Sequence, residues 1–379
     1  MKTLTVTCGT YDGAVFALEY TIGPFKKEGP EYLKPLLFDP VAHNGCVTSI
    51  AVCNPVIVSG GTDEAIQVFS IPEQVRLGSL EVHTGTIRHL EFAPPCGIHA
   101  PIHFLSASDD GCIAIFRQQI SPPTTKASSP WSWECIRLLR RHKGPVISMS
   151  IHPSSRCAYS ISEDKTFRIW NLLRGRQAYA TRLKLVAPGA IGVTASPGGS
   201  RILFHWSDRF DLVDLILNDD SPGEREQWGR CLASVQFPQA LPAQPVIYSE
   251  DDREPEHPLD EPRWVYVLVG VGQNLKAFRC PCVPGDRQAE EYGDVRLPGK
   301  RIKFIRVLEW PHVDGDLDWH GRRCRLVVVV TTESSGSHIR GYAVNLNKPL
   351  EAGQSLLPVF AHDIDDARIT ALAADWSGI

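Results

Sequence analysis

The sequence has no long hydrophobic run, and its apolar residues rarely recur with helical spacing. The longest purely aliphatic stretch is Leu326–Val330, far short of the roughly 20 residues that a membrane-spanning helix needs. No hydrophobic leader begins at Met1, so we expect a soluble intracellular protein without a membrane span. What recurs is short apolar or alternating segments broken by Gly, Asp, Ser or Pro, which is typical of β-strands joined by turns.

The sequence also lacks an excess of charge of either sign. The formal net charge is −4 at pH 7, and charged residues make up 22% of the chain. This balance excludes a phosphate-binding surface that covers the whole protein, but it allows a local basic patch. Apolar residues make up 43%, which is enough for a substantial core and argues against disorder.

The cysteines form neither a disulfide pattern nor a metal-binding pattern. Eleven of them occur at irregular spacing, which favours buried thiols in a reducing compartment. Cys280 and Cys282 are the only close pair, with no second pair and no nearby His, so we expect no zinc site. Gly270 and Gly272 lack the third Gly and the helix of a nucleotide-binding loop. We therefore expect no cofactor.

One short pattern occurs several times and favours a repeat fold. An aspartate in a predicted β-turn precedes a short strand in GGTDEAIQVF, SASDDGCIAIF, SISEDKTFRIW and HWSDRFDLVDL. Three of these segments follow a His-x-Gly, which begins at His43, His83 and His142. Units of two strands with the same turn residues predict a repeat architecture. They say much less about function, because such folds support many activities.

The predicted strands group into units of four. The second unit contains Val47–Cys53, Val56–Gly61, Ala65–Ile71 and Arg76–Glu81. The fourth contains Val146–Ile151, Cys157–Ser162, Thr166–Asn171 and Gln177–Arg182.

The two ends of the chain complete each other. Three predicted strands lie between Leu4 and Asp39, the last of them Lys34–Asp39, and one strand, Arg368–Asp375, is left over. Pairing the two ends removes both exposed sheet edges. We therefore predict an all-β, seven-bladed WD-repeat β-propeller that forms one domain over 1–379, with blade 1 made from 4–39 plus 368–375. Two packed β-sandwiches are the alternative, but they leave the repeated turn residues unexplained.

The pattern is less regular in the second half. We expect a fifth blade from Ala190–Ala195, Arg201–Trp206 and Phe210–Leu215, with no outer strand assigned, and a sixth blade that begins with Cys231–Phe237. The acidic, Pro-rich segment 239–262 is predicted to be an insertion, either a solvated loop or a docking site for a basic partner.

His, Ser and Asp residues are expected to converge in three blades. Such a set can indicate a catalytic triad, but three nucleophile sites on one chain have no evident purpose. WD-repeat blades tie a loop to a turn with a network that these residues resemble, and a buried Asp bonded to His is expected to stabilise the blade. Phe69 and Phe116 replace the customary Trp in two blades. The predicted structural residues are His43, Ser59, Asp63, His83, Ser106, Asp110, His142, Ser160, Asp164 and Trp170.

Basic side chains gather in three short stretches of the sequence. These are solvated strand faces or contacts to RNA phosphates, and the sequence leaves both interpretations open. The stretches contain Arg137, Arg140, Arg141 and Lys143; Lys300, Arg301, Lys303 and Arg306; and Arg322, Arg323 and Arg325.

One long segment carries a specific resemblance. Trp133–Lys184, which begins WECIRLLRRHKGPVISMSIHP, closely resembles the PAK-interacting-protein family, whose yeast member is known as the maintenance-of-killer ribosome-assembly protein. The terminal segments TCGTYDGAVFALEY and ARITALAADW are similar to that family's termini. The resemblance is tight over His43–Lys184 and loose over Asp219–Arg325.

The resemblance implies a non-enzymatic scaffold in the nucleus and nucleolus that acts in biogenesis of the large (60S) ribosomal subunit. It implies a ribosomal-protein-like assembly factor and early pre-ribosomal particles as partners, with rRNA reached through a basic edge. A PAK-type kinase is a further partner of animal members. The alternative is a cytoplasmic or nuclear adaptor that negatively regulates such a kinase or acts as a substrate receptor. We expect a monomeric propeller, and a basic C-terminal tail that is missing after Ile379.

WD propellers often bind partners through the residue before the turn Asp and through a residue near the start of the inner strand. Here these positions combine aromatic, charged and apolar side chains, as expected around an interface anchor. The candidate partner-binding residues are Tyr11, Thr48, Thr62, Arg88, Asp109, Ile147 and Glu163.

Overall fold

The structure is a computed structural model of the 379-residue chain. It describes residues 2–21, 31–94, 100–119, 132–214, 230–239, 241, 243–250, 264–282, 288–310, 324–333, 336–345, 348–353, 355–365 and 367–377. The chain divides into two compact units. The first contains Met1–Lys27, Tyr32–Leu183 and Ala367–Ile379, and the second contains Glu28–Glu31 and Lys184–Asp366.

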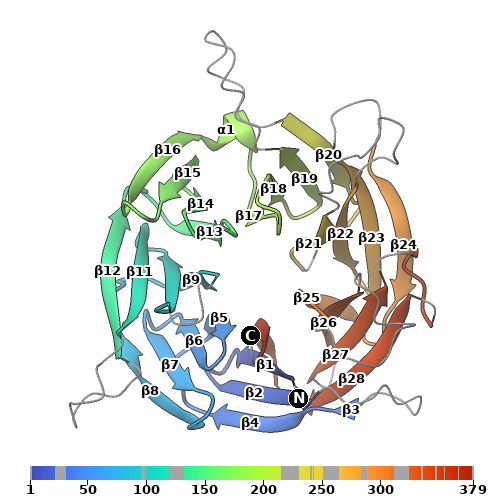
Figure 1. Cartoon of the computed structure of the whole chain (residues 1–379), viewed down its shortest axis with the longest axis horizontal. Coiled ribbons are helices and arrows are strands. Elements are labelled where there is room, and N and C mark those ends of the chain that lie inside the picture. Colours follow the sequence, from blue (N-terminus) through green and yellow to red (C-terminus); the bar gives the residue numbers. More distant parts are fainter. Residues whose placement is uncertain are drawn as a thin grey trace. The chain divides into compact units, whose positions relative to one another are not determined.

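The first unit contains four antiparallel blades (Figure 1). Blade 1 is β29 (Ile369–Trp376), β1 (Thr3–Thr10), β2 (Val15–Thr21) and β4 (Lys34–Asp39). Blade 2 is β5 (Val47–Cys53), β6 (Val56–Gly61), β7 (Ile66–Ser70) and β8 (Val75–Leu80). Blade 3 is β9 (Ile87–Phe92), β10 (His103–Ser108), β11 (Cys112–Gln119) and β12 (Ser132–Arg140). Blade 4 is β13 (Val146–Ile151), β14 (Cys157–Ser162), β15 (Thr166–Asn171) and β16 (Arg176–Arg182).

The second unit contains three blades, and a short helix, α1 (Leu183–Val186), follows blade 4. Blade 5 is β17 (Gly192–Ala195), β18 (Arg201–His205), β19 (Arg209–Asp214) and β20 (Arg230–Gln236). Blade 6 is β21 (Val246–Glu250), β22 (Trp264–Val271), β23 (Asn274–Pro281) and β24 (Glu290–Arg296). Blade 7 is β25 (Arg301–Glu309), β26 (Cys324–Thr332), β27 (Gly336–Asn345) and β28 (Leu356–Asp365), with β3 (Glu31–Tyr32) as a fifth strand.

These seven sheets confirm the predicted all-β, seven-bladed β-propeller fold. They also confirm that strands from the two ends of the chain share one blade. β29 pairs antiparallel with β1, with Trp376 opposite Leu4 and Ala373 opposite Thr7. The backbone N–H of Ser377 donates to the carbonyl of Thr3 at 2.7 Å, so the pairing extends past the end of β29.

The strand assignment between blades 5 and 6 corrects the sequence prediction. Cys231–Phe237 was expected to begin blade 6, but β20 pairs with β19 as the outer strand of blade 5. The inner strand of blade 6 is β21, which lies inside the segment predicted to be an insertion. Local alternation identifies a strand but not its neighbour in the sheet, so it could not assign β20. The rest of the acidic stretch, 251–262, lies outside the described residues.

The cores of the first unit lie within and between its blades. One cluster surrounds Phe104 and Phe116, whose rings stack with centroids 4.6 Å apart. Another surrounds Met149 and Trp170. Neighbouring blades approach closely where β6 meets β9, because a Cβ added at Gly60 would lie 2.4 Å from Cγ2 of Ile87. The position therefore requires glycine for steric reasons.

Candidate functional site

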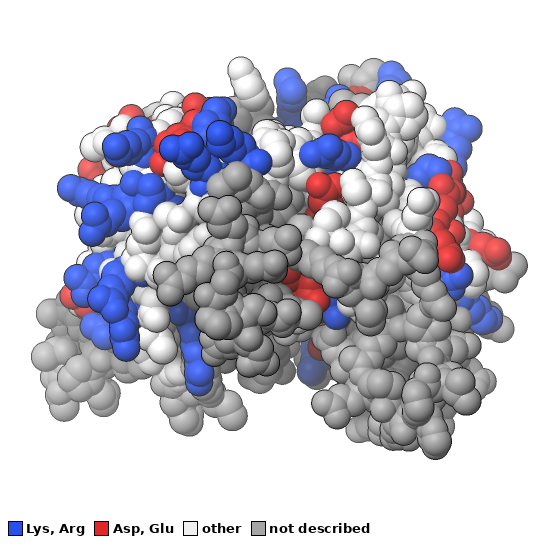
Figure 2. Space-filling view, turned by 90° about the horizontal axis from the view of Figure 1, so that it is seen from above, with Lys and Arg blue, Asp and Glu red and all other residues white. Residues whose placement is uncertain are grey.

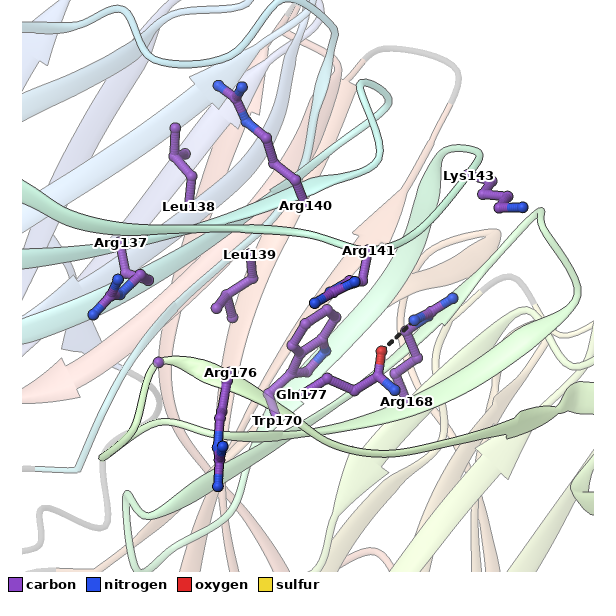
Figure 3. Close-up of a pocket in the computed structure, with 11 residues that line it drawn as sticks. Arg137, Leu138, Leu139, Arg140, Arg141, Lys143, Arg168, Trp170, Arg176 and Gln177 are labelled. Carbon is purple, nitrogen blue, oxygen red and sulfur yellow. Dashed lines mark hydrogen bonds between the residues drawn. The ribbon is translucent and has the colours of Figure 1, made fainter.

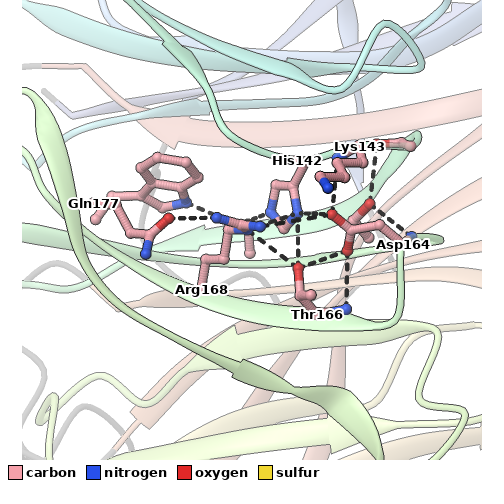
Figure 4. A network of polar contacts seen from close by, with 10 residues as sticks. His142, Lys143, Asp164, Thr166, Arg168 and Gln177 are labelled. Atoms are coloured by element: carbon pink, nitrogen blue, oxygen red, sulfur yellow. Dashed lines mark hydrogen bonds and ion pairs between the residues drawn. The ribbon is translucent and has the colours of Figure 1, made fainter.

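The fourth blade brings together the four residues predicted to form its network, and Figure 4 labels two of them, His142 and Asp164. Nδ1 of His142, which precedes β13, lies 3.0 Å from Oδ2 of Asp164 in the β14–β15 turn. Nε2 of the same ring lies 2.8 Å from Oγ of Ser160 on β14. The indole N–H of Trp170 on β15 donates to Ser160 Oγ at 2.8 Å. The network therefore connects the loop before the blade, the turn and two strands.

Blades 2 and 3 repeat this arrangement without the indole. In blade 2, His43 Nδ1 lies 2.9 Å from Asp63 Oδ1, and its Nε2 lies 2.7 Å from Ser59 Oγ. In blade 3 the corresponding distances are 2.8 Å from His83 to Asp110 and 2.7 Å from His83 to Ser106. The positions of Trp170 are taken by the buried rings of Phe69 and Phe116.

The serines of these networks are closed to substrates. Ser59, Ser106 and Ser160 each have 0% solvent exposure. In blade 4, the hydroxyl of Ser160 is held between His142 and Trp170. A serine nucleophile must reach its substrate, so these three sets support the blades rather than a reaction.

The protonation states fit this supporting role. Burial opposes ionisation of Asp110 and Asp164, but hydrogen bonds outweigh it and lower the pKa of each carboxyl to about 2. Asp110 accepts from the ring of His83 and from backbone N–H groups, and Asp164 accepts from the Thr166 hydroxyl, the N–H of Lys143 and the ring of His142. The pKa of Asp63 is lowered in the same way. Burial lowers the pKa of His142 to about 4, although Asp164 opposes this shift. At neutral pH a neutral His142 therefore donates from Nδ1 to an ionised Asp164 and accepts from Ser160.

Three of the candidate partner-binding residues form one charged group on the first unit. Arg88 donates from Nε and Nη2 to the two carboxylate oxygens of Asp109 at 2.7 and 2.8 Å. This bond raises the pKa of Arg88, and the nearby carboxylate of Glu163 adds to the effect. The Arg88 side chain remains 50% exposed. It is therefore fixed in direction and open to a partner.

The other four candidates have different surroundings. Tyr11 is 57% exposed, and the guanidinium of Arg368 lies 5.7 Å from its ring centroid. The hydroxyl of Thr48 donates to the carbonyl of Gly60 at 3.0 Å and also contacts the carbonyl of Ile87, so it connects blades 2 and 3. Thr62 Oγ1 accepts from the N–H of Cys46 at 3.1 Å. Ile147 is half-buried near the start of β13. Structural contacts therefore occupy both threonines.

A basic cavity of about 920 Å³ opens beside the outer strands of blades 3 and 4 (Figure 3). The sequence analysis singled out Arg137, Arg140, Arg141 and Lys143, and all four line it. It missed Arg168 and Arg176, because nothing in the sequence shows that β15 and β16 lie beside β12. Figure 2 shows Lys and Arg gathered at the left of the view, the side of the first unit on which Figure 1 draws β12 and β16.

The described residues contain neither a metal-binding cluster nor a membrane-spanning helix. No group of three or more His, Cys, Asp or Glu side chains in these residues is placed to hold a metal ion. Within the same residues, no helix has the length and apolar character that crossing a membrane requires. Cys280 and Cys282 are both buried, and burial raises the pKa of the Cys280 thiol to about 12.

The blade networks resemble those of WD repeats, and one repeat of this chain also matches a family model. The family described as "WD domain, G-beta repeat" matches residues 133–171, from β12 to the end of β15. This match covers the repeat that contains Trp170.

The chain is also similar to several curated proteins. It is 32% identical over 214 residues to the p21-activated protein kinase-interacting protein 1-like of Xenopus laevis, covering 56% of this chain and 52% of that protein. It is 29% identical over 192 residues to protein MAK11 of Saccharomyces cerevisiae, covering 47% and 43%. It is 28% identical over 180 residues to the Shk1 kinase-binding protein 15 of Schizosaccharomyces pombe, covering 46% and 45%.

These matches confirm the predicted resemblance: the chain is a relative of the PAK-interacting and MAK11 WD-repeat proteins. The matches span about half the length of the curated relatives. Two of the three relatives are named for binding a kinase.

Proposed function

We propose that the protein is a non-enzymatic nucleolar scaffold in biogenesis of the large (60S) ribosomal subunit. It binds a ribosomal-protein-like assembly factor on early pre-ribosomal particles, as a monomeric propeller in a single domain over 1–379. The proposal rests on the family resemblance of Trp133–Lys184 and on the relatives that share it. The basic cavity beside β12 favours a partner that contains RNA, because Arg and Lys in a cluster complement phosphates.

The assembly factor binds at the charged group of Arg88, Asp109 and Glu163, with Tyr11 as a second anchor. Arg and Tyr are enriched among residues that dominate binding energy. Arg88 is already held by Asp109 at 2.7 Å, so its side chain loses little conformational entropy when a partner docks. Tyr11 is the aromatic side chain among the seven candidates, and it is 57% exposed.

A second function is an adaptor, cytoplasmic or nuclear, that negatively regulates a PAK-type kinase or acts as a substrate receptor. The observation that favours it is the name of two of the relatives, which describes them as kinase-interacting or kinase-binding. The same exposed residues would serve that interaction.

Purification of the tagged protein under native conditions separates the two functions. We expect precursor rRNA and large-subunit assembly factors to be recovered with it. Recovery of a kinase or a ubiquitin ligase, without precursor rRNA, would favour the adaptor. Imaging of the tagged chain adds an independent readout, since the scaffold is expected to concentrate in the nucleolus.

A further inference from the structure

The basic cavity is built from two neighbouring blades of the first unit. Successive side chains of a strand point to opposite faces, and Figure 3 shows Arg137, Leu139 and Arg141 on the side of β12 that faces β15 and β16. From that opposite side, Arg168 on β15 and Arg176 on β16 complete the lining. Cations therefore line both walls of one open depression.

The positive charge of this cavity is poorly compensated. Of the six cationic residues that line it, only Arg168 has a nearby carboxylate, that of Asp164 at 3.9 Å. Asp164 is already bonded to His142 and to the N–H of Lys143. The other five form no ion pair with any carboxylate in the described part of the chain. They are Arg137, Arg140, Arg141, Lys143 and Arg176, and all are exposed.

Two arginines outside the cavity are each paired with a carboxylate on the neighbouring strand. Arg117 donates to Glu134 at 3.1 Å across β11 and β12, and Arg279 donates to Glu290 at 2.8 Å across β23 and β24. Within the cavity, burial lowers the pKa of Arg168, and the neighbouring charge of Arg141 lowers it further against the effect of Asp164. An anion placed between the two guanidinium groups would relieve this repulsion.

The spacing of the cations sets the size of the anion. Arg137 on β12 and Arg141, the residue after the end of β12, are four residues apart, which corresponds to about 13 Å in an extended chain. Six cations line the cavity, so a single phosphate would leave most of their positive charge uncompensated. A ligand that neutralises the cavity therefore carries several anionic groups in a row. Guanidinium groups bind phosphate oxygens in bidentate fashion, so a phosphodiester chain fits this requirement.

The lining also indicates how such a chain is recognised. Trp170 is the only aromatic residue of the lining; it has 0% exposure, and its N–H is bonded to Ser160. No aromatic face among these residues is open for a base to stack on, as single-strand binders require. The absence of an exposed aromatic anchor also disfavours a docked protein segment. The contacts available are those to phosphate and sugar, which position a nucleic acid without reading its sequence.

We propose that this cavity binds the phosphate backbone of structured RNA without sequence preference. The choice of RNA over DNA rests on the proposed function. Gln177 holds Arg168 in place, since its Oε1 accepts a hydrogen bond from Nη1 of that residue. Arg141 and Arg176 provide exposed charges that RNA can reach from solvent.

The test measures binding of a labelled RNA hairpin to the purified chain at several salt concentrations. The site variant is Arg141→Gln with Arg176→Gln. The control is Arg156→Gln with Arg174→Gln, which removes two exposed arginines of the same blade that lie outside the lining. We expect the site variant to bind roughly tenfold more weakly and with a salt slope smaller by about two, because each of the two arginines neutralises one phosphate. The control should bind as the wild type does, with equal melting temperatures for all three.

Equal RNA affinity of site and control variants would overturn the proposal. Binding of inositol hexakisphosphate but not of the hairpin would assign the cavity to a small polyanion, and binding of poly-glutamate alone would assign it to an acidic protein segment. Either result contradicts an RNA site. If the hairpin fails to bind while precursor rRNA is still recovered with the tagged protein, this inference fails and the proposed scaffold function stands. If the hairpin binds through the cavity but no pre-ribosomal particle is recovered, the RNA site stands and the proposed scaffold function fails.

Discussion

His142 shows how one side chain can join distant parts of a blade. Its ring donates to Asp164 in a turn and accepts from Ser160 on a strand, and both partners are buried or partly buried. Hydrogen bonds in such surroundings contribute modestly when made, but leaving one partner unpaired is costly. These pairs could be predicted because the His-x-Gly loop and the turn aspartate recur in three blades and resemble the network that ties loop to turn in WD repeats.

Replacing Asp164 by Ala is expected to destabilise the protein by about 1–3 kcal/mol, because it leaves the Nδ1–H of His142 and the N–H of Lys143 without their acceptor. The matched control is Asp12→Ala, which removes an exposed turn aspartate. Urea denaturation of both variants measures the difference. A stability loss for Asp164→Ala no larger than that of the control would show that the network does not support the blade.

Acid should destabilise the protein between about pH 6.5 and pH 4 in part through His142. Its pKa is lowered to about 4 in the folded state from an ordinary value of 6.5. Between these two values the unfolded chain binds more protons than the folded chain, so the free energy of unfolding decreases as the pH is lowered. The carboxyl of Asp164, whose pKa is lowered to about 2, loses its contribution only below its ordinary value of 3.8.

The difference between wild type and His142→Gln isolates this contribution, because His205 also has a pKa lowered to about 4 and titrates in both proteins. Melting temperatures measured from pH 7 to pH 4 should fall less steeply for the variant. Parallel curves for the two proteins would mean that His142 does not titrate as described.

At the scale of the strand, the close contact between blades 2 and 3 depends on a glycine. Gly60 lies near the end of β6 against Ile87, the first residue of β9, and Thr48 bonds to carbonyls of both residues. Strands of one blade therefore fit against the next only where the facing side chain is absent or small.

Gly60→Ala is expected to cost about 1–3 kcal/mol, because the added Cβ would lie 2.4 Å from Cγ2 of Ile87 and force the two blades apart. Gly78→Ala on β8 is the control, since nothing lies within 4 Å of a Cβ at that position. Chemical denaturation compares the two. If both substitutions leave stability equal or higher, the steric account of Gly60 is wrong.

The sequence predicted strands well where a turn aspartate and alternating apolar residues coincide. β13, β14 and β15 have the predicted bounds, and so do β5 and β6. The sequence did not predict which strands pair with each other. It assigned β20 to the wrong blade, and it did not predict β21, which lies in a Pro-rich segment. For the same reason the sequence predicted only four of the six cations that line the basic cavity, because Arg168 and Arg176 join it through packing between blades.

At the scale of the molecule, the chain ends hold the first unit together. β29 covers the edge of β1, and the carboxylate of Asp375 accepts a hydrogen bond from the N–H of Asn54, between β5 and β6, at 2.8 Å. The C-terminal strand therefore supports blade 2 as well as blade 1.

Deleting 368–379 should expose the whole edge of β1, whose residues from Leu4 to Thr10 are all buried. An exposed, long and apolar edge strand promotes pairing with other chains, so we expect aggregation or loss of cooperative melting. Size-exclusion chromatography and a thermal melt measure both. A monomeric truncated chain that melts as the full chain does would show that β29 is dispensable.

The measurement that tests the account most directly is recovery of the assembly factor and precursor rRNA with tagged wild-type chain and with Tyr11→Ala combined with Arg88→Glu. Both side chains are exposed, at 57% of the residue for Tyr11 and 50% of the side chain for Arg88, so the variant should melt close to the wild type. We predict that the wild type recovers both partners and that the variant loses most of the assembly factor. Undiminished recovery by a folded variant, or a wild type that recovers neither partner, would contradict the account.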